Sequence, residues 1–185
     1  MRKPLWITLV VLLAIPVVSL AQYNEQGPSK INVRGGMHQP AGSRLKDESP
    51  LWVDFGVDYV LAFDEAQSPQ DVASLSYTGS SKNLLQAKLL GLQFMRYWSS
   101  STEPDKGFYY GAGAGVYLAA VKLDEAFPTP AVDESKVQAG LTVMGGYHLS
   151  PYWFAEVRYT KMEELAEGVD LSGLSVFVGV KRFLE

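Results

Sequence analysis

The sequence predicts an all-β protein whose strands cross a membrane, and two observations support this prediction. Apolar and polar residues alternate with a period of two in eight segments separated by turn-like residues, while a helical period is nowhere sustained. Beyond the N-terminal segment no apolar run approaches the ~18 residues of a membrane-spanning helix. Any crossing of a membrane must therefore be made by strands.

The N-terminal segment is typical of a secretory signal peptide. Arg2 and Lys3 precede an apolar run from Leu5 to Val18, which is shorter than the ~20 residues that a membrane anchor needs. Ser19 and Ala21 supply small residues before the expected cleavage point. We expect a signal peptide over residues 1–21 and one barrel domain over residues 22–185.

Charge and cysteine content exclude several classes of protein. Removal of residues 1–21 leaves 14 basic against 20 acidic residues, which argues against nucleic acid as a partner. The chain has no cysteine, so it can carry neither disulfides nor a lipoprotein attachment site.

The clearest strand runs from Leu51 to Phe63. Seven apolar residues occupy every second position there, and two of the positions between them are Asp54 and Asp58. This length matches the ~9–11 residues of a tilted membrane-crossing strand. The other expected strands lie at about 31–38, 72–78, 83–98, 108–121, 137–149, 153–160 and 174–181. In the segment 83–98 the alternation changes phase, which predicts a β-bulge near Leu89 and Leu90 and places Lys88 on the polar face.

The ionisable residues decide which face is inside, because those within the expected strands share the polar face. We expect these side chains to fill the barrel interior: Arg34, Asp54, Asp58, Lys88, Glu156, Arg158 and Lys181. We expect the opposite face to touch lipid through Val53, Phe55, Val57, Tyr59, Val176, Val178 and Val180. A soluble barrel with its apolar face inward is the alternative.

Aromatic residues and connections favour the membrane alternative. Nine of the 22 aromatic residues flank two turns expected at one end of the barrel. We expect four of them to form an interfacial girdle: Trp98, Tyr110, Tyr147 and Trp153. A tight periplasmic turn is expected at Ser150-Pro151, and the outer loops are expected at 39–50, 80–82, 122–136 and 162–170. The connection at 99–106 is long for a periplasmic turn.

Three stretches resemble the small outer-membrane β-barrel family, which includes the barrel domain of outer-membrane protein A and the opacity-type proteins. They are FYYGAGAGVY, GLTVMGGYHLSPYWFAEVRYTKM and LSGLSVFVGVKRF. The resemblance implies an eight-stranded antiparallel up-and-down transmembrane β-barrel in the outer membrane of a diderm bacterium, inserted by the barrel assembly machinery. Members of the family commonly end on a lipid-facing aromatic residue. Here Leu184 takes that position, between Phe183 and Glu185.

Candidate chemistry is sparse because the chain has two histidines. His148 and Ser150 resemble the His-x-Ser pair of lipid A deacylase, with Glu156 as an orienting acid. We expect Glu156 to point inward towards Arg158 instead, so we expect no enzyme. His38 and His148 lie on different strands without clustered ligands, so neither a metal site nor a cofactor is expected.

The sequence therefore predicts a non-enzymatic outer-membrane barrel with a structural or surface-interaction role and an interior plugged by charged side chains. The expected partners are outer-membrane lipids, including lipopolysaccharide, while any surface ligand is left unidentified. The alternatives are a narrow channel, a lipid A-modifying hydrolase and a soluble periplasmic barrel that binds an apolar ligand.

Overall fold

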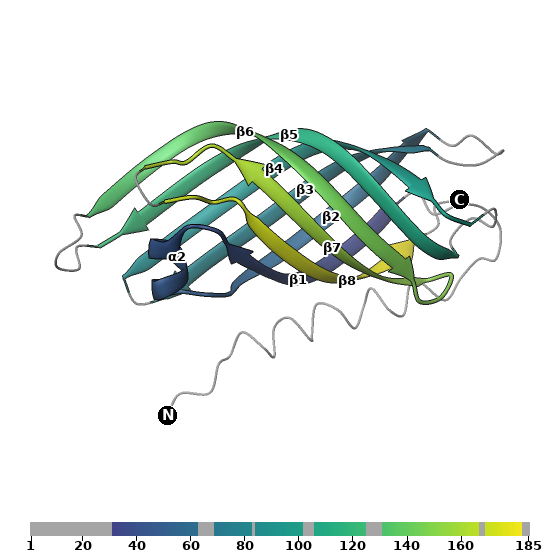
Figure 1. The fold of residues 1–185 in the computed structure, drawn as a ribbon, viewed down its shortest axis with the longest axis horizontal. Helices are drawn as coiled ribbons and strands as arrows, with labels where there is room; N and C mark the ends of the chain where they lie inside the picture. Colours follow the sequence, from purple (N-terminus) through teal and green to yellow (C-terminus); the bar gives the residue numbers. More distant parts are fainter. Residues whose placement is uncertain are drawn as a thin grey trace, which may run out of the picture.

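The chain forms a closed antiparallel barrel in which each strand pairs with the next and β1 pairs with β8 (Figure 1). A computed structural model describes residues 31–62, 69–82, 84–101, 106–124, 131–166 and 169–182. The elements are β1 (Ile31–Pro40), α2 (Ser43–Glu48), β2 (Trp52–Ala62), β3 (Gln70–Lys82), β4 (Leu85–Ser99), β5 (Gly107–Leu123), β6 (Val132–His148), β7 (Trp153–Met162) and β8 (Gly173–Arg182). The predicted up-and-down eight-stranded fold is confirmed.

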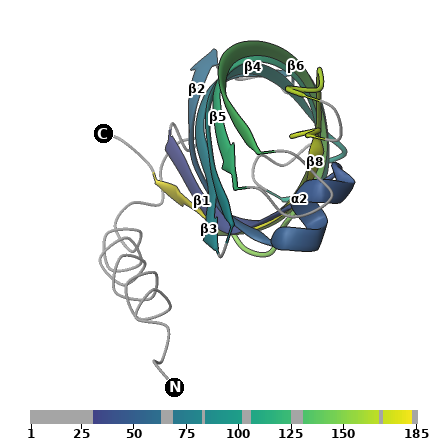
Figure 2. The same ribbon diagram turned by 90° about the vertical axis from the view of Figure 1, so that its left-hand side faces the viewer.

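Seen along its axis, the barrel is a closed ring with α2 at its rim (Figure 2). We call this the α2 end, because the connections after β1, β3, β5 and β7 all lie there. The end where β1 begins and β8 finishes is called the terminal end. Among the described residues, no helix is both long and apolar enough to span a membrane. The expected signal peptide, and the C-terminal residues from Phe183 to Glu185, lie outside the described residues.

The strands are those expected, but several connections differ. The expected loop 39–50 contains the short helix α2, whose Leu45 is fully buried. Both β5 and β6 have 17 residues, so strand structure continues into the expected loop 122–136. The ladder between β6 and β7 starts at Gly140, so residues 132–139 of β6 pair only with β5 and project beyond β7.

The expected β-bulge in β4 is wrong. Both ladders of β4 run without interruption from Leu85 to Tyr97, so one face keeps the same parity throughout. Leu85, Ala87 and Leu89 therefore point inward and are buried, while Lys88 points outward and is exposed. The phase change in the sequence marks the point where the outward face of β4 changes from polar, at Gln86 and Lys88, to apolar, from Leu90 onward. The register shift in the barrel lies instead in β2, between Val60 and Ala62.

The outer face of the barrel is apolar from strand to strand. Its most exposed large side chains include Leu141 at 67% and Phe94 at 62%. Six residues of the expected lipid-facing set lie exposed on this face: Val53, Phe55, Val57, Tyr59, Val176 and Val178. Val180 has the same parity but is only 7% exposed, at a position where its cross-strand partners are Val33 and Trp153. Val180 is therefore not among the exposed apolar residues of this face, and its contact with lipid stays a prediction.

Aromatic side chains gather on the outer face at the terminal end. Trp98 near the end of β4 stacks on Tyr110 near the start of β5, with ring centroids 5.7 Å apart. Tyr147 and Trp153 occupy the corresponding positions on β6 and β7, and both are exposed. The four residues of the expected girdle therefore share one end and one face.

Candidate functional site: the filled interior of the barrel

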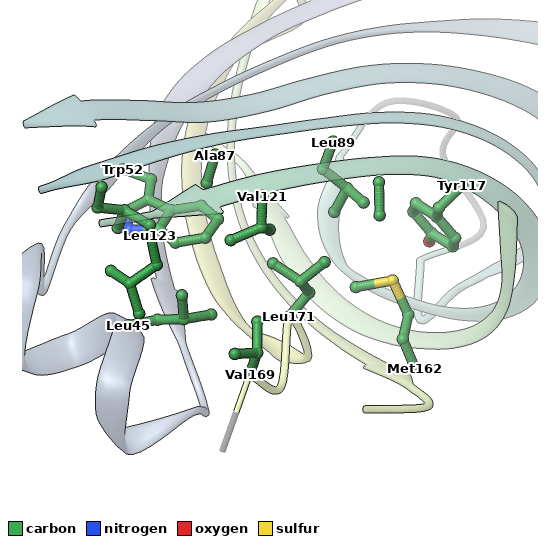
Figure 3. Close-up of a cluster of buried hydrophobic side chains, with 12 residues drawn as sticks. Leu45, Trp52, Ala87, Leu89, Tyr117, Val121, Leu123, Met162, Val169 and Leu171 are labelled. Carbon is green, nitrogen blue, oxygen red and sulfur yellow. The ribbon is translucent and has the colours of Figure 1, made fainter. Parts of the chain in front are cut away.

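The interior has three layers, and the layer at the α2 end is apolar. We call this layer the apolar plug (Figure 3). Its residues are Leu45, Trp52, Leu85, Ala87, Leu89, Tyr117, Ala119, Val121, Leu123, Met162, Val169 and Leu171. Leu45 reaches it from α2, while Val169 and Leu171 reach it from the segment between β7 and β8. The mouth of the barrel is therefore closed by side chains from two connections as well as from strands.

Hydrogen bonds fix these two connections to each other and to the rim. The Ala41 and Gly42 amides donate to the carbonyls of Ser172 (2.6 Å) and Asp170 (3.0 Å). The Trp52 indole donates to the Ser49 carbonyl at 2.9 Å, just after α2. Because α2 has only six residues and no side-chain cap at its N-terminus, its position depends on these bonds and on Leu45.

The middle layer is an ion network that crosses the lumen. Arg34 on β1 binds Asp58 on β2 through an ion pair and donates to the Ser74 hydroxyl at 3.0 Å. Gly56 lies opposite Arg34 in the ladder, and a Cβ at Gly56 would occupy the position of the Arg34 guanidinium. A glycine is therefore required there for the guanidinium to lie against the backbone.

Arg158 on β7 connects this pair to the far side of the barrel. Its guanidinium lies 2.8 Å from a carboxylate oxygen of Asp58 and forms a second ion pair with Glu156. It also donates to the Tyr97 hydroxyl at 2.6 Å. Tyr109 donates to Glu156 at 3.1 Å. Each carboxylate of the network is thus matched by a guanidinium and a hydroxyl, as a buried charge requires.

Phe177 on β8 lies beside both guanidinium groups. Its ring centroid is 5.0 Å from the guanidinium carbon of Arg34 and 5.9 Å from that of Arg158. Both distances fall within the range of cation–π attraction. One aromatic ring thereby helps to hold two like charges in the same layer.

A second polar group lies between the network and the apolar plug. The Ser175 hydroxyl donates to Asp54 at 2.7 Å, and the Nδ1 atom of His38 lies 3.0 Å from the same hydroxyl. These three residues, with Arg34 and Gln93, help to line a cavity of about 20 Å³, which is large enough for a single water molecule. A catalytic triad would place histidine between serine and the acid, whereas here the serine lies between the other two. All three side chains are also nearly fully buried, so a substrate has no access.

The third layer, at the terminal end, is apolar again. It consists of Val60, Val72, Met95, Tyr97, Tyr109, Met144 and Phe154. The hydroxyls of Tyr97 and Tyr109 reach from this layer into the ion network. The interior is therefore packed with side chains over its described length, as expected for eight strands.

The structure places the expected interior charges as follows. The residues buried inside the barrel are Arg34, Asp54, Asp58, Glu156, Arg158 and Lys181. Lys88 is the exception, because the unbroken register of β4 turns it outward. Sequence reasoning missed both apolar layers. In residues 85–89 and 119–123 the apolar parity points inward, while the parity that carries Gln86, Lys88 and Lys122 points outward. This local reversal, in which the charged parity faces outward, is the signal of an apolar layer inside the barrel at the α2 end.

His148 and Ser150, the candidate pair of the hydrolase alternative, both make contacts that stabilise the local structure. The Ser150 hydroxyl accepts hydrogen bonds from the Tyr152 and Trp153 amides at 3.2 and 3.1 Å, which stabilises the turn between β6 and β7. The His148 ring stacks on Tyr109 at 4.4 Å. Glu156, the candidate orienting acid, is bound by Arg158 and Tyr109. Its carboxylate is thus committed to the ion network.

A closed antiparallel barrel with an apolar outer face and a packed interior that holds an ion network defines a class: the small eight-stranded membrane barrels. Comparison with solved structures shows the same fold. The chain is similar to the N-terminal barrel domain of Pseudomonas aeruginosa OprF, with a TM-score of 0.59 and 13% identity over 84% of this chain and 98% of that one. It is also similar to Yersinia pestis Ail, the attachment invasion locus protein (TM-score 0.56, 13% identity, 85% and 99% covered).

A third similar structure is Neisserial surface protein A, with a TM-score of 0.53 and 12% identity over 86% of this chain and all of that one. No protein-family model and no curated protein matches the sequence. At these identities the likeness shows the fold alone. The resemblance to small outer-membrane barrels inferred from the sequence is thereby confirmed at the level of the fold.

Proposed function

We propose that the protein is a non-enzymatic outer-membrane barrel of a diderm bacterium, with a closed interior and a structural or surface-interaction role. The observation that carries this proposal is the combination of an apolar outer face with a packed interior whose middle layer is a network of paired charges. A soluble ligand-binding barrel would have the opposite arrangement.

The outer face supports a membrane location. On β4 the outward apolar residues Leu90, Leu92 and Phe94 lie between the outward charges of Lys88 and Arg96. The eight residue steps from Lys88 to Arg96, on a strand tilted by about 40°, span about 20 Å, close to the ~25 Å apolar band of such barrels. Exposed apolar residues continue around the whole ring, far beyond the patches that soluble monomers expose.

The interior supports a closed barrel rather than a channel. Three buried cations, Arg34, Arg158 and Lys181, lie in the same interior as the three carboxylates of Asp54, Asp58 and Glu156. Among the described residues these charges match in number, which favours pairing within the barrel over a mobile counter-ion. The apolar plug adds a dry layer that an ion would have to cross, at high free-energy cost.

The α2 end supports a role in surface interactions. In the proposed orientation it faces the cell exterior, and the hairpin of β5 and β6 projects beyond β7 there. Loops held on a rigid barrel are a common place for partner binding. Because the interior is packed, partner specificity in this proposal resides in the loops and in this hairpin.

Cell fractionation tests the location. We expect the full chain to separate with the outer membrane and to migrate differently on a gel with and without boiling, because a folded barrel resists detergent until it is heated. Release by osmotic shock, or migration that boiling does not change, would contradict the proposal.

Two further measurements test the closed, non-enzymatic interior. Single-channel recording in planar bilayers should show no conductance steps, whereas a narrow channel would show them. Mass spectrometry should find the same lipid A in cells with and without the protein. A lost acyl chain that depends on Ser150 would instead support the hydrolase alternative.

A further inference from the structure

At its α2 end the outer face carries a group of polar side chains on β3, β4 and β5. We call it the Lys88 patch and define it as Tyr77, Gln86, Lys88 and Lys122. All four side chains are exposed. Their parity on the strands is that of Leu90, Leu92 and Leu118, which belong to the apolar outer face. The patch therefore borders the apolar band.

The register brings the two lysines together. Lys88 pairs with Ala120 and Gln86 pairs with Lys122, so Lys88 and Lys122 are diagonal neighbours on one face of adjacent strands. Such neighbours lie about 7–8 Å apart, and two lysine side chains can converge on one anion from that spacing. Small residues flank Lys88 on both sides, because Gly79 pairs with it on β3 and Ala120 on β5.

Tyr77 adds a hydroxyl group to the same place. A Cβ built on Gly79 would lie 2.8 Å from the Tyr77 hydroxyl oxygen, so the phenol extends along β3 over Gly79. Since Gly79 is the cross-strand partner of Lys88, the hydroxyl lies beside that lysine. Only glycine leaves room for the ring in this position.

Lys88 and Lys122 differ from two other outward cations, which form ion pairs with carboxylates. Arg96 is bound by Asp71 at 2.7 Å and Lys161 by Asp170 at 3.0 Å. Within the described part of the chain, neither Lys88 nor Lys122 has an ion pair. Asp133 lies opposite Lys122 in the ladder and is the acidic group closest in register to the patch.

We infer that the Lys88 patch binds a phosphate group of a glycolipid in the outer leaflet. The inference rests on the proposed function, which places the α2 end of the apolar band at the level of the outer-leaflet headgroups. A lipid phosphate there meets two ammonium groups that form no ion pair with a described residue, while the acyl chains of the same lipid lie along Leu90 and Leu118. A soluble anion has no acyl chains, so it would gain nothing from the apolar contact with Leu90 and Leu118.

Native mass spectrometry of the full-length folded chain in detergent, titrated with bis-phosphorylated lipid A, tests the inference. The variant Lys88→Gln/Lys122→Gln should bind lipid A about 10- to 30-fold more weakly, since each lysine near an anionic headgroup contributes about fivefold. Asp133→Asn should bind more tightly than the wild type, because it removes the competing carboxylate. Raised salt should weaken wild-type binding.

A matched control is Lys46→Gln/Lys136→Gln, which removes the same charge from the α2 end. Lys46 lies on α2, and Lys136 pairs with the inward-facing Ala119, so neither belongs to the apolar outer face. This control should bind lipid A like the wild type. Dephosphorylated lipid A should bind the wild type weakly. Its affinity should not exceed the affinity of bis-phosphorylated lipid A for the Lys88/Lys122 variant.

The inference is overturned if the Lys88/Lys122 variant binds as tightly as the wild type or if the control loses as much. It is also overturned if inorganic phosphate displaces lipid A at equal concentration, because the site would then select a free anion. Each variant is first tested for insertion into vesicles and for boiling-dependent migration. A wild-type chain that fails to insert contradicts the proposed function too, whereas an inserted chain without phosphate preference contradicts only this inference.

Discussion

The Arg158 guanidinium lies 2.8 Å from the Asp58 carboxylate, although β7 and β2 are not neighbours in the ring and 100 residues separate the two positions. The pair therefore crosses the inside of the barrel rather than running along a ladder. It joins the Arg34–Asp58 pair on one wall to the Arg158–Glu156 pair on the other. This single contact makes two local ion pairs into one network.

Replacement of Arg158 by methionine should destabilise the barrel strongly. Asp58 would keep Arg34, but Glu156 would lose its guanidinium in a buried setting, which typically costs about 3–5 kcal/mol. Urea unfolding in lipid vesicles, followed by tryptophan fluorescence, measures the free energy of unfolding. Lys88→Met, at an outward lysine that has no ion pair within the described residues, serves as the control and should change stability little.

Gly56→Ala should weaken the same network at Arg34, on the wall of the barrel formed by β1 and β2. The new methyl group would occupy the position of the Arg34 guanidinium and push it away from Asp58. We expect a loss of about 1–3 kcal/mol, the usual cost of overpacking. Gly35→Ala on the outer face is the matched control, since its Cβ would meet Phe55 at an ordinary 3.4 Å. Equal unfolding midpoints for the two variants would contradict the close approach of Arg34 to Gly56.

Leu45→Ala should loosen the closure of the α2 end without opening the ion network. Leu45 is fully buried and belongs to a six-residue helix, so truncation costs about 2–5 kcal/mol of packing that α2 cannot replace. Hydrogen exchange should rise in residues 41–52 and 169–172 but not in the middle of β2 or β7. Faster exchange throughout the barrel would show that the plug and the network unfold together.

Asp170 should make the α2 end sensitive to acid. Burial acts to raise the pKa of Asp170, but hydrogen bonds from Ser172 and Lys161 outweigh it and hold this pKa below its ordinary value. A lowered pKa in the folded state means that the ionised form stabilises this segment above the ordinary carboxyl pKa of about 3.9 and that the effect is lost as the pH falls. Proteolysis in the segment 163–172 should increase at low pH, with an acid-stable protease as the probe. Asp170→Asn should remove most of this pH dependence.

Much of the fold follows from the sequence because the period of two reports which face a residue takes. Alternation alone assigns Val53, Phe55, Val57 and Tyr59 to one face of their strand, with the two aspartates between them on the other. Six of the seven expected interior charges, all except Lys88, lie inside for the same reason. Alternation is a local property, so it needs no knowledge of neighbouring strands.

Other features depend on tertiary structure. The two apolar interior layers, the burial of Leu45 from a six-residue helix and the outward position of Lys88 depend on which strands pair and in which register. A segment in which the apolar alternation changes phase, such as 85–90, fits either a bulged or a regular strand, and only its partners on β3 and β5 decide between them. Likewise, the sequence supplied the charges of Arg158 and Asp58, but only closure of the ring between β1 and β8 brings them within 2.8 Å across the lumen.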